Sequence, residues 1–275
     1  MAVKILHNDD NFIIVNKPYD MYINSDDVNE KNTVACHIAR QDSHLSSSSQ
    51  PLHFVQRLDY ATSGVLCIAK NKRAAAKAGS LLEKRFAKKY YLAVLRGHVK
   101  FPSCSIEYEI GDDPSTQDTN HKMLAVTDPA SQSASRSRSA RTTLLVLETG
   151  FYEGDPATVV LMKPTTGRRH QLRVHCSTIG HTILGDYTYS DGKDASTDRM
   201  FLHAMRLVLP FQDETLDIQT AEPFYSDDSF NNKWKTETVF HGFRESDEFI
   251  STCAVIDLLS EDSDILVFQY TSKPS

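Results

Sequence analysis

The sequence lacks several features that would assign it to common protein classes. It has no run of about 20 apolar residues, the length that a membrane-spanning helix needs. It has no G-x-G-x-x-G and no Walker loop, so nucleotide binding and phosphoryl transfer have no sequence support. The first ten residues include acids and no extended apolar stretch, which is atypical of a signal or transit peptide.

Cysteine is scarce and irregularly spaced. The chain of 275 residues contains five cysteines and no C-x-x-C pair. This pattern argues against a disulfide framework and against a structural zinc site. We therefore expect an intracellular protein of a reducing compartment, cytoplasmic or nuclear, that is neither secreted nor bound to a membrane.

The charge distribution is strongly asymmetric. The net charge of −6 by itself argues against a nucleic-acid binder. However, residues 70–100 carry ten Lys/Arg and one acid, whereas residues 211–275 carry fourteen Asp/Glu and four Lys/Arg. Such asymmetry indicates either a polyanion-binding region beside an acidic tail or simply two solvated surfaces of opposite sign.

Short apolar runs predict buried strands, which we place at 12–17, 65–69, 91–95 and 200–209. Two further β-rich runs, 143–147 and 158–162, flank a turn-rich link and predict a long hairpin. After Pro223 the pattern weakens, although apolar runs persist at 254–259 and 265–270.

Two helices and two irregular regions complete the expected organisation. In residues 71–89, Ala74, Ala78, Leu81, Leu82 and Phe86 follow helical spacing. A second helix is expected from about Arg168 to Ile179, with Leu172, Cys176 and Ile179 as its buried stripe and Gly180 as its end. The serine-rich residues 43–49 predict a surface loop, and residues 111–141 lack periodicity, with a low-complexity, mobile stretch at 131–141.

The segment Gln56–Gly64 (QRLDYATSG) concentrates reactive side chains just before a predicted buried strand. Loops carried on a rigid sheet are common positions for catalytic groups, which makes Asp59 a candidate. The alternative is structural: Asp59 is a turn residue, and the hydroxyls of Thr62 and Ser63 bond the backbone.

The segment Thr165–His175 places three arginines where the expected helix begins. The helix macrodipole is positive at that end, so each cation there costs roughly 0.3–1 kcal/mol. Arg169 and Arg173 are spaced i, i+4 and would share a face. A carboxylate or phosphate ligand would explain the arrangement; the alternative is a merely solvated basic turn.

Four segments together resemble the RluA family of RNA pseudouridine synthases. QRLDYATSG resembles the family motif H-R-L-D-x-x-T-S-G, and TGRRHQLRVHCSTIGHTILGDYTY resembles T-G-R-x-H-Q-I-R-V-H followed by G-H-P-I-x-G-D-x-x-Y. IIVNKP and KKYYLAVLRG resemble two further family motifs, V-V-N-K-P and K-x-Y-x-A … G. The spacing looks most like the animal branch called RNA pseudouridylate synthase domain-containing proteins, type one.

This resemblance implies a role for individual residues. The catalytic aspartate of the family matches Asp59, and Arg57 matches the arginine that helps to displace the target nucleotide from its stack. Tyr91 matches the family tyrosine, which could relay a proton or stack on the base. Arg173 matches the arginine that pairs with the catalytic carboxylate.

The resemblance has two departures: Gln56 replaces the usual histidine, and Thr182 replaces the usual proline. It also implies a mixed α/β (α+β) fold with a long, mostly antiparallel mixed sheet, flanking helices and a central cleft. We expect a catalytic domain at 1–225, with no S4 domain, and an acidic C-terminal extension at 226–275.

The implied activity is isomerisation of specific uridines in RNA, without a cofactor or metal. His170 and His175 are spaced i, i+5, which does not suit one metal-binding helix face. We expect a monomer whose partner is RNA, bound by eight basic side chains: Arg57, Lys72, Arg73, Lys88, Lys89, Arg168, Arg169 and His170.

Two other functions are open from the sequence. A catalytically silent RNA-binding protein could retain the fold, since Gln56 and the acidic C-terminal region depart from the expected pattern. A glycosidase could use Asp59, but the motifs offer no obvious second acid.

Overall fold

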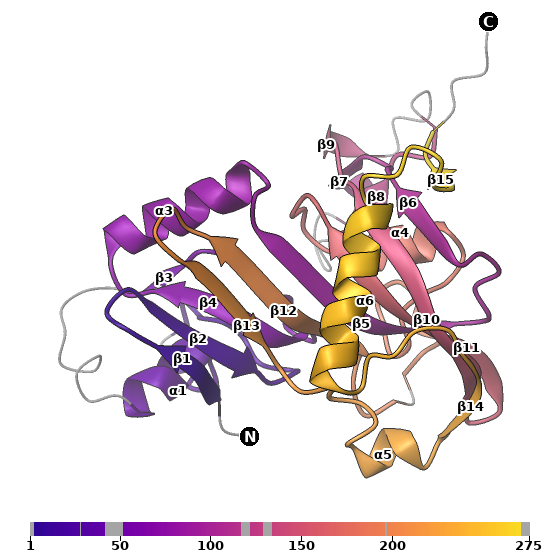
Figure 1. Cartoon of the computed structure of the whole chain (residues 1–275), viewed down its shortest axis with the longest axis horizontal. Coiled ribbons are helices and arrows are strands. Elements are labelled where there is room, and N and C mark those ends of the chain that lie inside the picture. Colours follow the sequence, from indigo (N-terminus) through magenta and orange to yellow (C-terminus); the bar gives the residue numbers. More distant parts are fainter. Residues whose placement is uncertain are drawn as a thin grey trace, which may run out of the picture. The chain divides into compact units, whose positions relative to one another are not determined.

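The computed structural model describes residues 3–27, 29–41, 52–116, 122–128, 134–195 and 197–270. The chain forms two compact units, each built from two separate stretches of sequence (Figure 1). Unit 1 comprises Met1–Lys89 and Leu202–Ala221, and unit 2 comprises Tyr90–Phe201 and Glu222–Ser275. This division differs from the expected boundary at 225/226, because residues 226–275 belong to the same unit as the middle of the chain. The serine-rich 43–49 lies outside the described residues.

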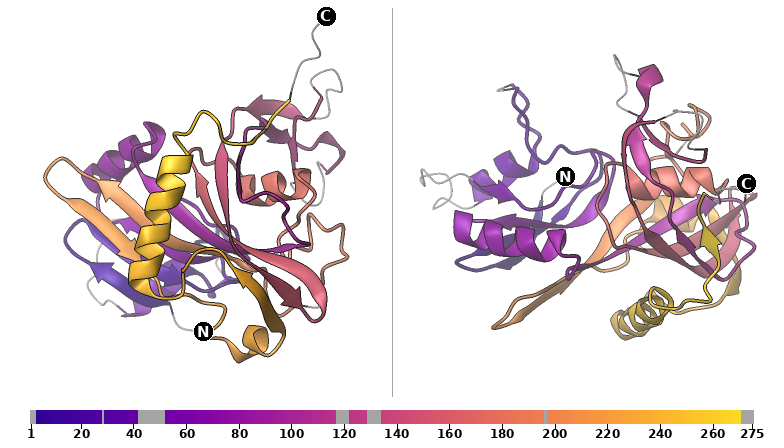
Figure 2. Two further views of the ribbon diagram at one scale, coloured as in Figure 1. Left: turned by 45° about the vertical axis from the view of Figure 1, so that its right-hand side comes forward. Right: turned by 90° about the horizontal axis from the view of Figure 1, so that it is seen from above.

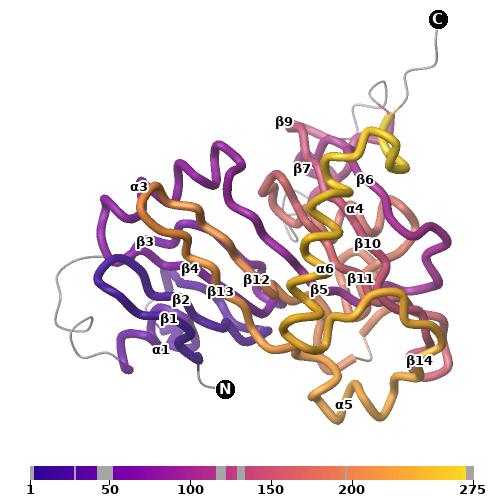
Figure 3. The backbone as a smooth tube through the Cα atoms, viewed as in Figure 1, coloured from indigo at the N-terminus to yellow at the C-terminus, as the bar shows by residue number. Residues whose placement is uncertain are grey.

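In unit 1, strands from two distant parts of the sequence lie side by side (Figure 3). The strands are β1 (Lys4–Asn8), β2 (Phe12–Lys17), β3 (His53–Phe54), β4 (Ser63–Ala69), β12 (Leu202–Pro210) and β13 (Thr215–Gln219). Their order is β1-β2-β4-β12, with β3 also paired to β4 and β13 to β12. Only β4 and β12 run parallel. The predicted strands at 12–17, 65–69 and 200–209 are confirmed.

Within the described residues of unit 1, the helices are α1 (Val34–Gln41) and α3 (Lys72–Glu83). Asn71 caps the N-terminus of α3, because its side chain accepts a hydrogen bond from the Ala74 amide. Apolar residues of α3 pack against those of β2, β4 and β12 in one core cluster. Burial of this apolar surface fixes the helix on the sheet.

α3 is shorter than the predicted helix at 71–89. Arg85 adopts a left-handed conformation (φ 63°), and the Phe86 amide bonds back to the Leu81 carbonyl, which closes the helix end. Phe86 is therefore 60% exposed and does not belong to the buried stripe. Glycine usually takes this position, so the sequence carries no signal for the ending.

Unit 2 carries its own set of paired strands. Its strands are β5 (Lys88–Arg96), β6 (Ser103–Ile106), β10 (Thr142–Tyr152), β11 (Asp155–Pro164), β14 (Trp234–Val239) and β15 (Val267–Phe268). The order is β5-β11-β10-β6-β15, with β14 also paired to β10. The predicted strand at 91–95 and the predicted hairpin are confirmed as β5 and β10–β11. The hairpin turns at Glu153 and Gly154, both with positive φ, as a two-residue turn requires.

A small three-stranded sheet occupies part of the region that showed no periodicity. It consists of β7 (Ile110–Asp112), β8 (Met123–Ala125) and β9 (Ser135–Arg138), in the order β8-β7-β9, with a 3₁₀ turn η1 (Pro114–Thr116) after β7. The prediction of a mobile stretch at 131–141 is therefore wrong for residues 135–138, which form β9. Strands of three or four residues are too short to show an alternating pattern.

The helices found in the described part of unit 2 are α4 (Gln171–Thr178), α5 (Asp228–Asn231) and α6 (Ser246–Leu259). Figure 2 shows α4 and α6 on opposite sides of the β10–β11 sheet. α6 contacts β10 and β11, and its last turn is bound by Lys163, whose Nζ lies 2.7 Å from Asp257 Oδ1. Within the described part of the chain, a helix with the length and hydropathy to cross a membrane is not found.

The C-terminal residues join unit 2 through a buried carboxylate. Glu148 on β10 is fully buried and accepts hydrogen bonds from Trp234 Nε1 (2.8 Å), the Thr236 hydroxyl and Arg244 Nη2 (2.8 Å). The Arg244 guanidinium also lies 3.9 Å from the centroid of the Tyr225 ring. A buried carboxylate needs such donors, so residues from 225 to 244 are structural partners of β10.

We predict that Arg244→Met lowers the free energy of unfolding by about 1–3 kcal/mol, because it removes a charged partner from buried Glu148. The measurement is urea unfolding followed by tryptophan fluorescence. Lys235→Met, on the exposed side of β14, is the matched control and should change stability by less than about 0.5 kcal/mol. Equal effects of the two substitutions would contradict the role given to Arg244.

Candidate active site

Asp59 lies in a tight turn of unit 1, in the connection from β3 to β4. The preceding Leu58 is buried, Asp59 itself is half-buried and Arg57 is exposed. The Thr62 amide donates to the Asp59 carbonyl at 3.1 Å, which closes the turn. The side chain of Asp59 is thus presented by a short, hydrogen-bonded loop directly before a fully buried strand.

The side chain of Lys17 hydrogen-bonds to the backbone of this turn. The lysine ends β2, is fully buried, and its Nζ donates to the carbonyls of Pro18, Tyr60 and Thr62 at 2.9, 2.8 and 2.9 Å. An ammonium group has three N–H donors, and each of these carbonyls can take one. The buried charge is stabilised by carbonyl dipoles, and the turn that carries Asp59 is fixed to the sheet.

A chain of hydrogen bonds continues from the same turn. Ser63 Oγ lies 2.7 Å from His203 Nδ1, and His203 Nε2 lies 2.7 Å from Thr220 Oγ1. Gly64 has a φ of +113° and faces the backbone of Ala204, where a Cβ would clash. The T-S-G of the motif thus joins β4 to β12, and the Ser63 hydroxyl bonds the side chain of His203 rather than the backbone that the structural alternative predicted.

In unit 2, Arg173 is buried on α4 and forms a two-pronged ion pair with Asp186. Arg173 Nε and Nη2 donate to the two carboxylate oxygens of Asp186 at 2.7 and 2.8 Å. Asp186 is 1% exposed and lies in the loop after α4. This geometry fixes the plane of the guanidinium.

Tyr189 packs against the other side of this arginine. The centroid of its ring lies 5.0 Å from Arg173 Cζ. Its hydroxyl lies 3.1 Å from His170 Nδ1 and accepts from the Met123 amide at 3.0 Å. Tyr189 therefore links α4 to the small sheet, whose Ile110 and Met123 share a core cluster with it.

α4 is fastened to the beginning of β10 by two of its own side chains. Gln171 Nε2 and His175 Nδ1 both lie 3.0 Å from Thr142 Oγ1. His175 Nε2 lies 3.1 Å from the Tyr108 carbonyl, and because a carbonyl only accepts, this nitrogen carries the proton. Burial lowers the pKa of His175 to about 4, so the ring is neutral at pH 7.

The beginning of α4 corrects the prediction made for residues 168–179. The helix begins at Gln171, after His170 in a left-handed conformation (φ 53°), so Arg168 and Arg169 precede it. Of the three arginines, Arg173 alone therefore lies in the first turn of the helix, where the macrodipole disfavours a cation. The Asp186 carboxylate neutralises its charge. Of the predicted stripe, Leu172 and Cys176 are buried as expected, whereas Ile179 is half-buried and follows the helix end. Burial is also wider than a stripe, since Gln171–Cys176 are all buried.

The other predicted residues have different environments. Tyr91 is half-buried on β5, opposite Met162 of β11. Arg168 Nε donates to the Ser139 carbonyl at 2.9 Å, so this arginine holds the segment after β9, whereas Arg169 is exposed. Asp59 belongs to unit 1 and Tyr91 and Arg173 to unit 2, so the pairing of Asp59 with Arg173 stays a prediction.

The basic region is mostly solvent-accessible. Lys72, Arg73 and Lys88 are exposed, as binding to phosphates requires. Lys89 differs, because burial lowers its pKa to about 8. Lys88 and Lys89 lie on β5 rather than on the predicted helix.

Sequence reasoning gave no role to Lys17, Asp186 or Tyr189, although all three lie in the segments that carry the resemblance. Lys17 is the lysine of N-K-P, and Asp186 and Tyr189 are the aspartate and last tyrosine of G-D-Y-T-Y. The family motifs therefore include these three residues. Their hydrogen-bond partners could not be predicted from the sequence, because Lys17 binds carbonyls 43 and 45 residues away.

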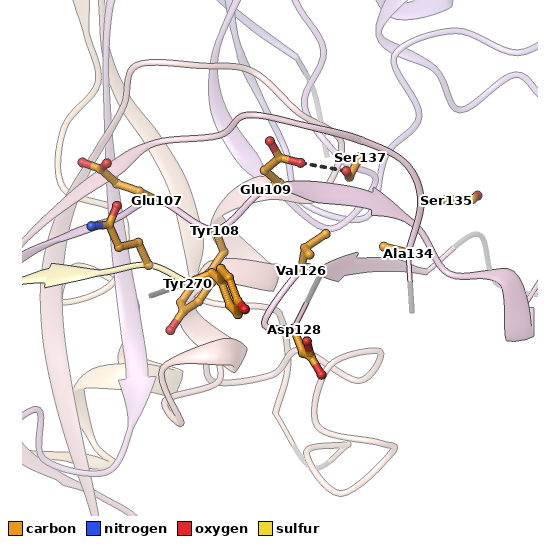
Figure 4. Close-up of a pocket in the computed structure, with 10 residues that line it drawn as sticks. Glu107, Tyr108, Glu109, Val126, Asp128, Ala134, Ser135, Ser137 and Tyr270 are labelled. Carbon is orange, nitrogen blue, oxygen red and sulfur yellow. Dashed lines mark hydrogen bonds between the residues drawn. The ribbon is translucent and has the colours of Figure 1, made fainter. Parts of the chain in front are cut away.

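A cavity of about 770 Å³ opens in unit 2 beside the small sheet (Figure 4). Three carboxylates line it, those of Glu107, Glu109 and Asp128, together with Tyr108 and Tyr270. None of the predicted catalytic residues is among its lining residues, and its acidic character does not suit an RNA backbone. Among the described residues, no group of three or more His, Cys, Asp or Glu side chains is arranged to hold a metal ion.

Comparison with known proteins decides the family. The model for "RNA pseudouridylate synthase" matches residues 11–178. The chain belongs to the RNA pseudouridylate synthase family. Its motifs in β2, the Asp59 turn, β5 and α4 all lie within the matched region.

Individual relatives agree with this assignment. RNA pseudouridylate synthase domain-containing protein 1 of Danio rerio is 38% identical over 84% of this chain and 78% of that protein. The dual-specificity RNA pseudouridine synthase RluA of Vibrio vulnificus is 34% identical over 74% of this chain and 76% of its own length. The solved structure of human RNA Pseudouridylate Synthase Domain Containing 1 has a TM-score of 0.76 at 33% identity, covering 92% of this chain and 94% of that chain.

These findings confirm the resemblance, the mixed α/β fold class and the prediction of an RNA-modifying isomerase. RNA is the substrate class of the family.

We predict that Lys17→Met destabilises the protein by about 2–4 kcal/mol, because the carbonyls of Pro18, Tyr60 and Thr62 lose the hydrogen bonds of the buried ammonium group. The measurement is urea unfolding, and tritium release from C5-labelled RNA reports the effect on the Asp59 turn. Lys4→Met, at an exposed position of β1, is the control. A Lys17 variant as stable as this control would show that the three hydrogen bonds contribute little.

The low pKa of His175 predicts a defined pH dependence of stability. The unfolded chain binds a proton near pH 6.5, whereas the folded protein does so only near pH 4. Stability is therefore fully present above pH 6.5 and falls by about 1.4 kcal/mol per pH unit towards pH 4. Urea unfolding of the wild type and His175→Gln at several pH values isolates this effect. Parallel stability curves for the two proteins would contradict it.

Proposed function

We propose that Asp59 is the catalytic carboxylate with which this chain converts uridine to pseudouridine in RNA. The observation that carries the proposal is the turn of the Q-R-L-D-Y-A-T-S-G motif, in which buried Lys17 fixes the backbone on both sides of Ala61. A reactive group must be held in place for catalysis, and here the support is a charge buried under the turn. The family membership of the chain supplies the reaction class.

The reaction needs a carboxylate and little else from the protein. The C1′–N1 bond of uridine breaks, the uracil rotates, and a C1′–C5 bond forms. An ionised carboxylate can attack or stabilise the electron-deficient centre that develops when the glycosidic bond breaks. No electron or phosphoryl group is transferred, which agrees with a sequence that has neither a Walker loop nor a dinucleotide fingerprint.

Arg173 is proposed as the cationic partner of the Asp59 carboxylate. A carboxylate in a desolvated site otherwise takes up a proton, and a guanidinium prevents this because it stays charged. Two of the five N–H donors of Arg173 bind Asp186, which sets the orientation of the group. In this proposal, Asp186 and Tyr189 are positioning residues for Arg173.

Tyr91 is proposed to act at the base. After the new bond forms, C5 must lose its proton, and a phenol can relay that proton or stack on the ring. Its strand, β5, is held along most of its length by β11, which gives Tyr91 a fixed backbone position.

RNA binding is proposed to use the exposed cations of α3 and the arginines near both motifs. Arg57 would fill the space left by the flipped nucleotide, a step that costs a few kcal/mol. Lys72, Arg73, Lys88 and Arg169 would contact phosphates. The proposed surface also includes Lys89, Arg168 and His170. Arg168 also donates to the Ser139 carbonyl, and His170 also hydrogen-bonds to the Tyr189 hydroxyl.

The proposed catalytic residues all lie within 1–225, so we propose that this part carries the chemistry and that the acidic 226–275 completes unit 2. One chain supplies every proposed residue, which supports a monomer. Four of the five free cysteines are buried, which supports a reducing compartment, cytoplasmic or nuclear.

We predict that Asp59→Asn lowers the rate of tritium release from RNA labelled at C5 of uridine by at least about 1,000-fold, because it removes the reacting carboxylate. Asp26→Asn, an exposed acid of unit 1, is the control and should keep the wild-type rate. Wild-type protein that binds the RNA pools but releases no tritium would instead favour a catalytically silent RNA-binding protein.

A further inference from the structure

Two tyrosines form an exposed pair beside the proposed catalytic turn. Tyr60 directly follows Asp59, and Tyr22 lies in the segment between β2 and α1. Their ring centroids are 4.6 Å apart at an interplanar angle of 51°. Tyr22 is 50% exposed and Tyr60 is 46% exposed, so about half of each residue faces solvent.

The backbone beneath the pair is fixed. The Tyr60 carbonyl accepts from Lys17 Nζ and from the Met21 amide, which joins the two tyrosine-bearing segments directly. The Tyr22 carbonyl accepts from the Val34 amide at 2.9 Å, at the first residue of α1. The rings therefore have a defined position even though they are not packed into the core.

The surroundings of the pair are acidic. Partial burial raises the pKa of Tyr60, and the charges of Asp20, Tyr22 and Glu30 raise it further. A phosphate would be repelled at this position, whereas a neutral base would not. Single exposed aromatic residues are ordinary, but two rings in contact next to a reactive group offer an aromatic surface on which a ligand ring can pack.

We propose that Tyr22 and Tyr60 form a stacking platform for a base of the RNA that neighbours the target uridine. Tyrosine rings stack on bases of any identity, and enzymes of single-stranded or flipped substrates use such contacts widely. Removing one nucleotide from a stack leaves its neighbours without a partner, and a ring pair beside the reacting group replaces that partner. The inference rests on the proposed function, since it places the platform next to Asp59.

The first experiment measures binding of the full chain to a fluorescein-labelled, 12-nucleotide oligouridine by fluorescence anisotropy. Tyr22→Leu and Tyr60→Leu should each raise the Kd by about 5- to 100-fold, the usual effect of losing one stacked base. Tyr22→Phe and Tyr60→Phe keep the ring and should stay within about twofold of the wild type. Tyr270→Leu, which removes a tyrosine of 42% exposure from unit 2, is the matched control and should bind like the wild type.

The second experiment identifies stacking itself. A single 2-aminopurine is placed at each position of the oligouridine in turn, and its fluorescence should be quenched at one or two adjacent positions by the wild type but not by Tyr60→Leu. Thermal unfolding of every variant confirms that the fold is retained.

The outcomes separate the platform from the catalytic proposal. Wild-type affinity in both leucine variants would overturn the platform and favour a protein contact at this surface, whatever the activity of Asp59. Phenylalanine variants as weak as the leucine variants would also overturn it, because a hydroxyl contact would then explain the loss. Quenching by a wild type that releases no tritium would support the platform and contradict the catalytic role of Asp59.

Discussion

The buried ammonium group of Lys17 fixes the turn that carries Asp59. Lys17 places its charge where no water reaches it and binds three backbone carbonyls, two of which belong to the turn that carries Asp59. Burying a cation is costly, so the arrangement persists only because all its donors are used. The same carbonyl of Tyr60 also binds the segment that presents Tyr22. The position of the carboxylate and that of the aromatic pair therefore depend on one side chain.

Unit 2 uses a different device for a similar purpose. Arg173 is oriented by the carboxylate of Asp186 and by the ring of Tyr189, and α4 itself is fixed to β10 by Gln171 and His175. Each of these groups has a polar partner within the fold, as buried polar groups require. A guanidinium held in this way has little freedom left to lose on binding a second acceptor, which is the condition for electrostatic preorganisation.

Much of this could be predicted from the sequence, and the reasons for the misses are physical. Buried strands such as β2 and β4 are continuous apolar runs, so their positions follow from composition. The end of α3 was missed because Arg85, not glycine, takes the left-handed conformation there, and the start of α4 because its first turn is preceded by His170 rather than by a capping Ser, Thr or Asp. The motifs identified Asp59 and Arg173 as candidates. The supports of these residues come from distant parts of the chain, and no spacing rule reveals that Lys17 meets Thr62 or that Glu148 meets Arg244.

Each unit is completed by a segment that is synthesised after most of its other strands. In unit 1, β12 and β13, which follow residue 201, pair beside strands formed by the first 70 residues. In unit 2, the partners of Glu148 are Trp234 and Arg244, which lie more than 80 residues later in the chain. On the ribosome, an N-terminal stretch that cannot finish its sheet exposes the edge of β4, and a strand with an unmet carboxylate cannot settle in a core. Unit 1 therefore completes its sheet only after β12 and β13 have left the exit tunnel, and Glu148 gains its cationic partner only after Arg244 has done so.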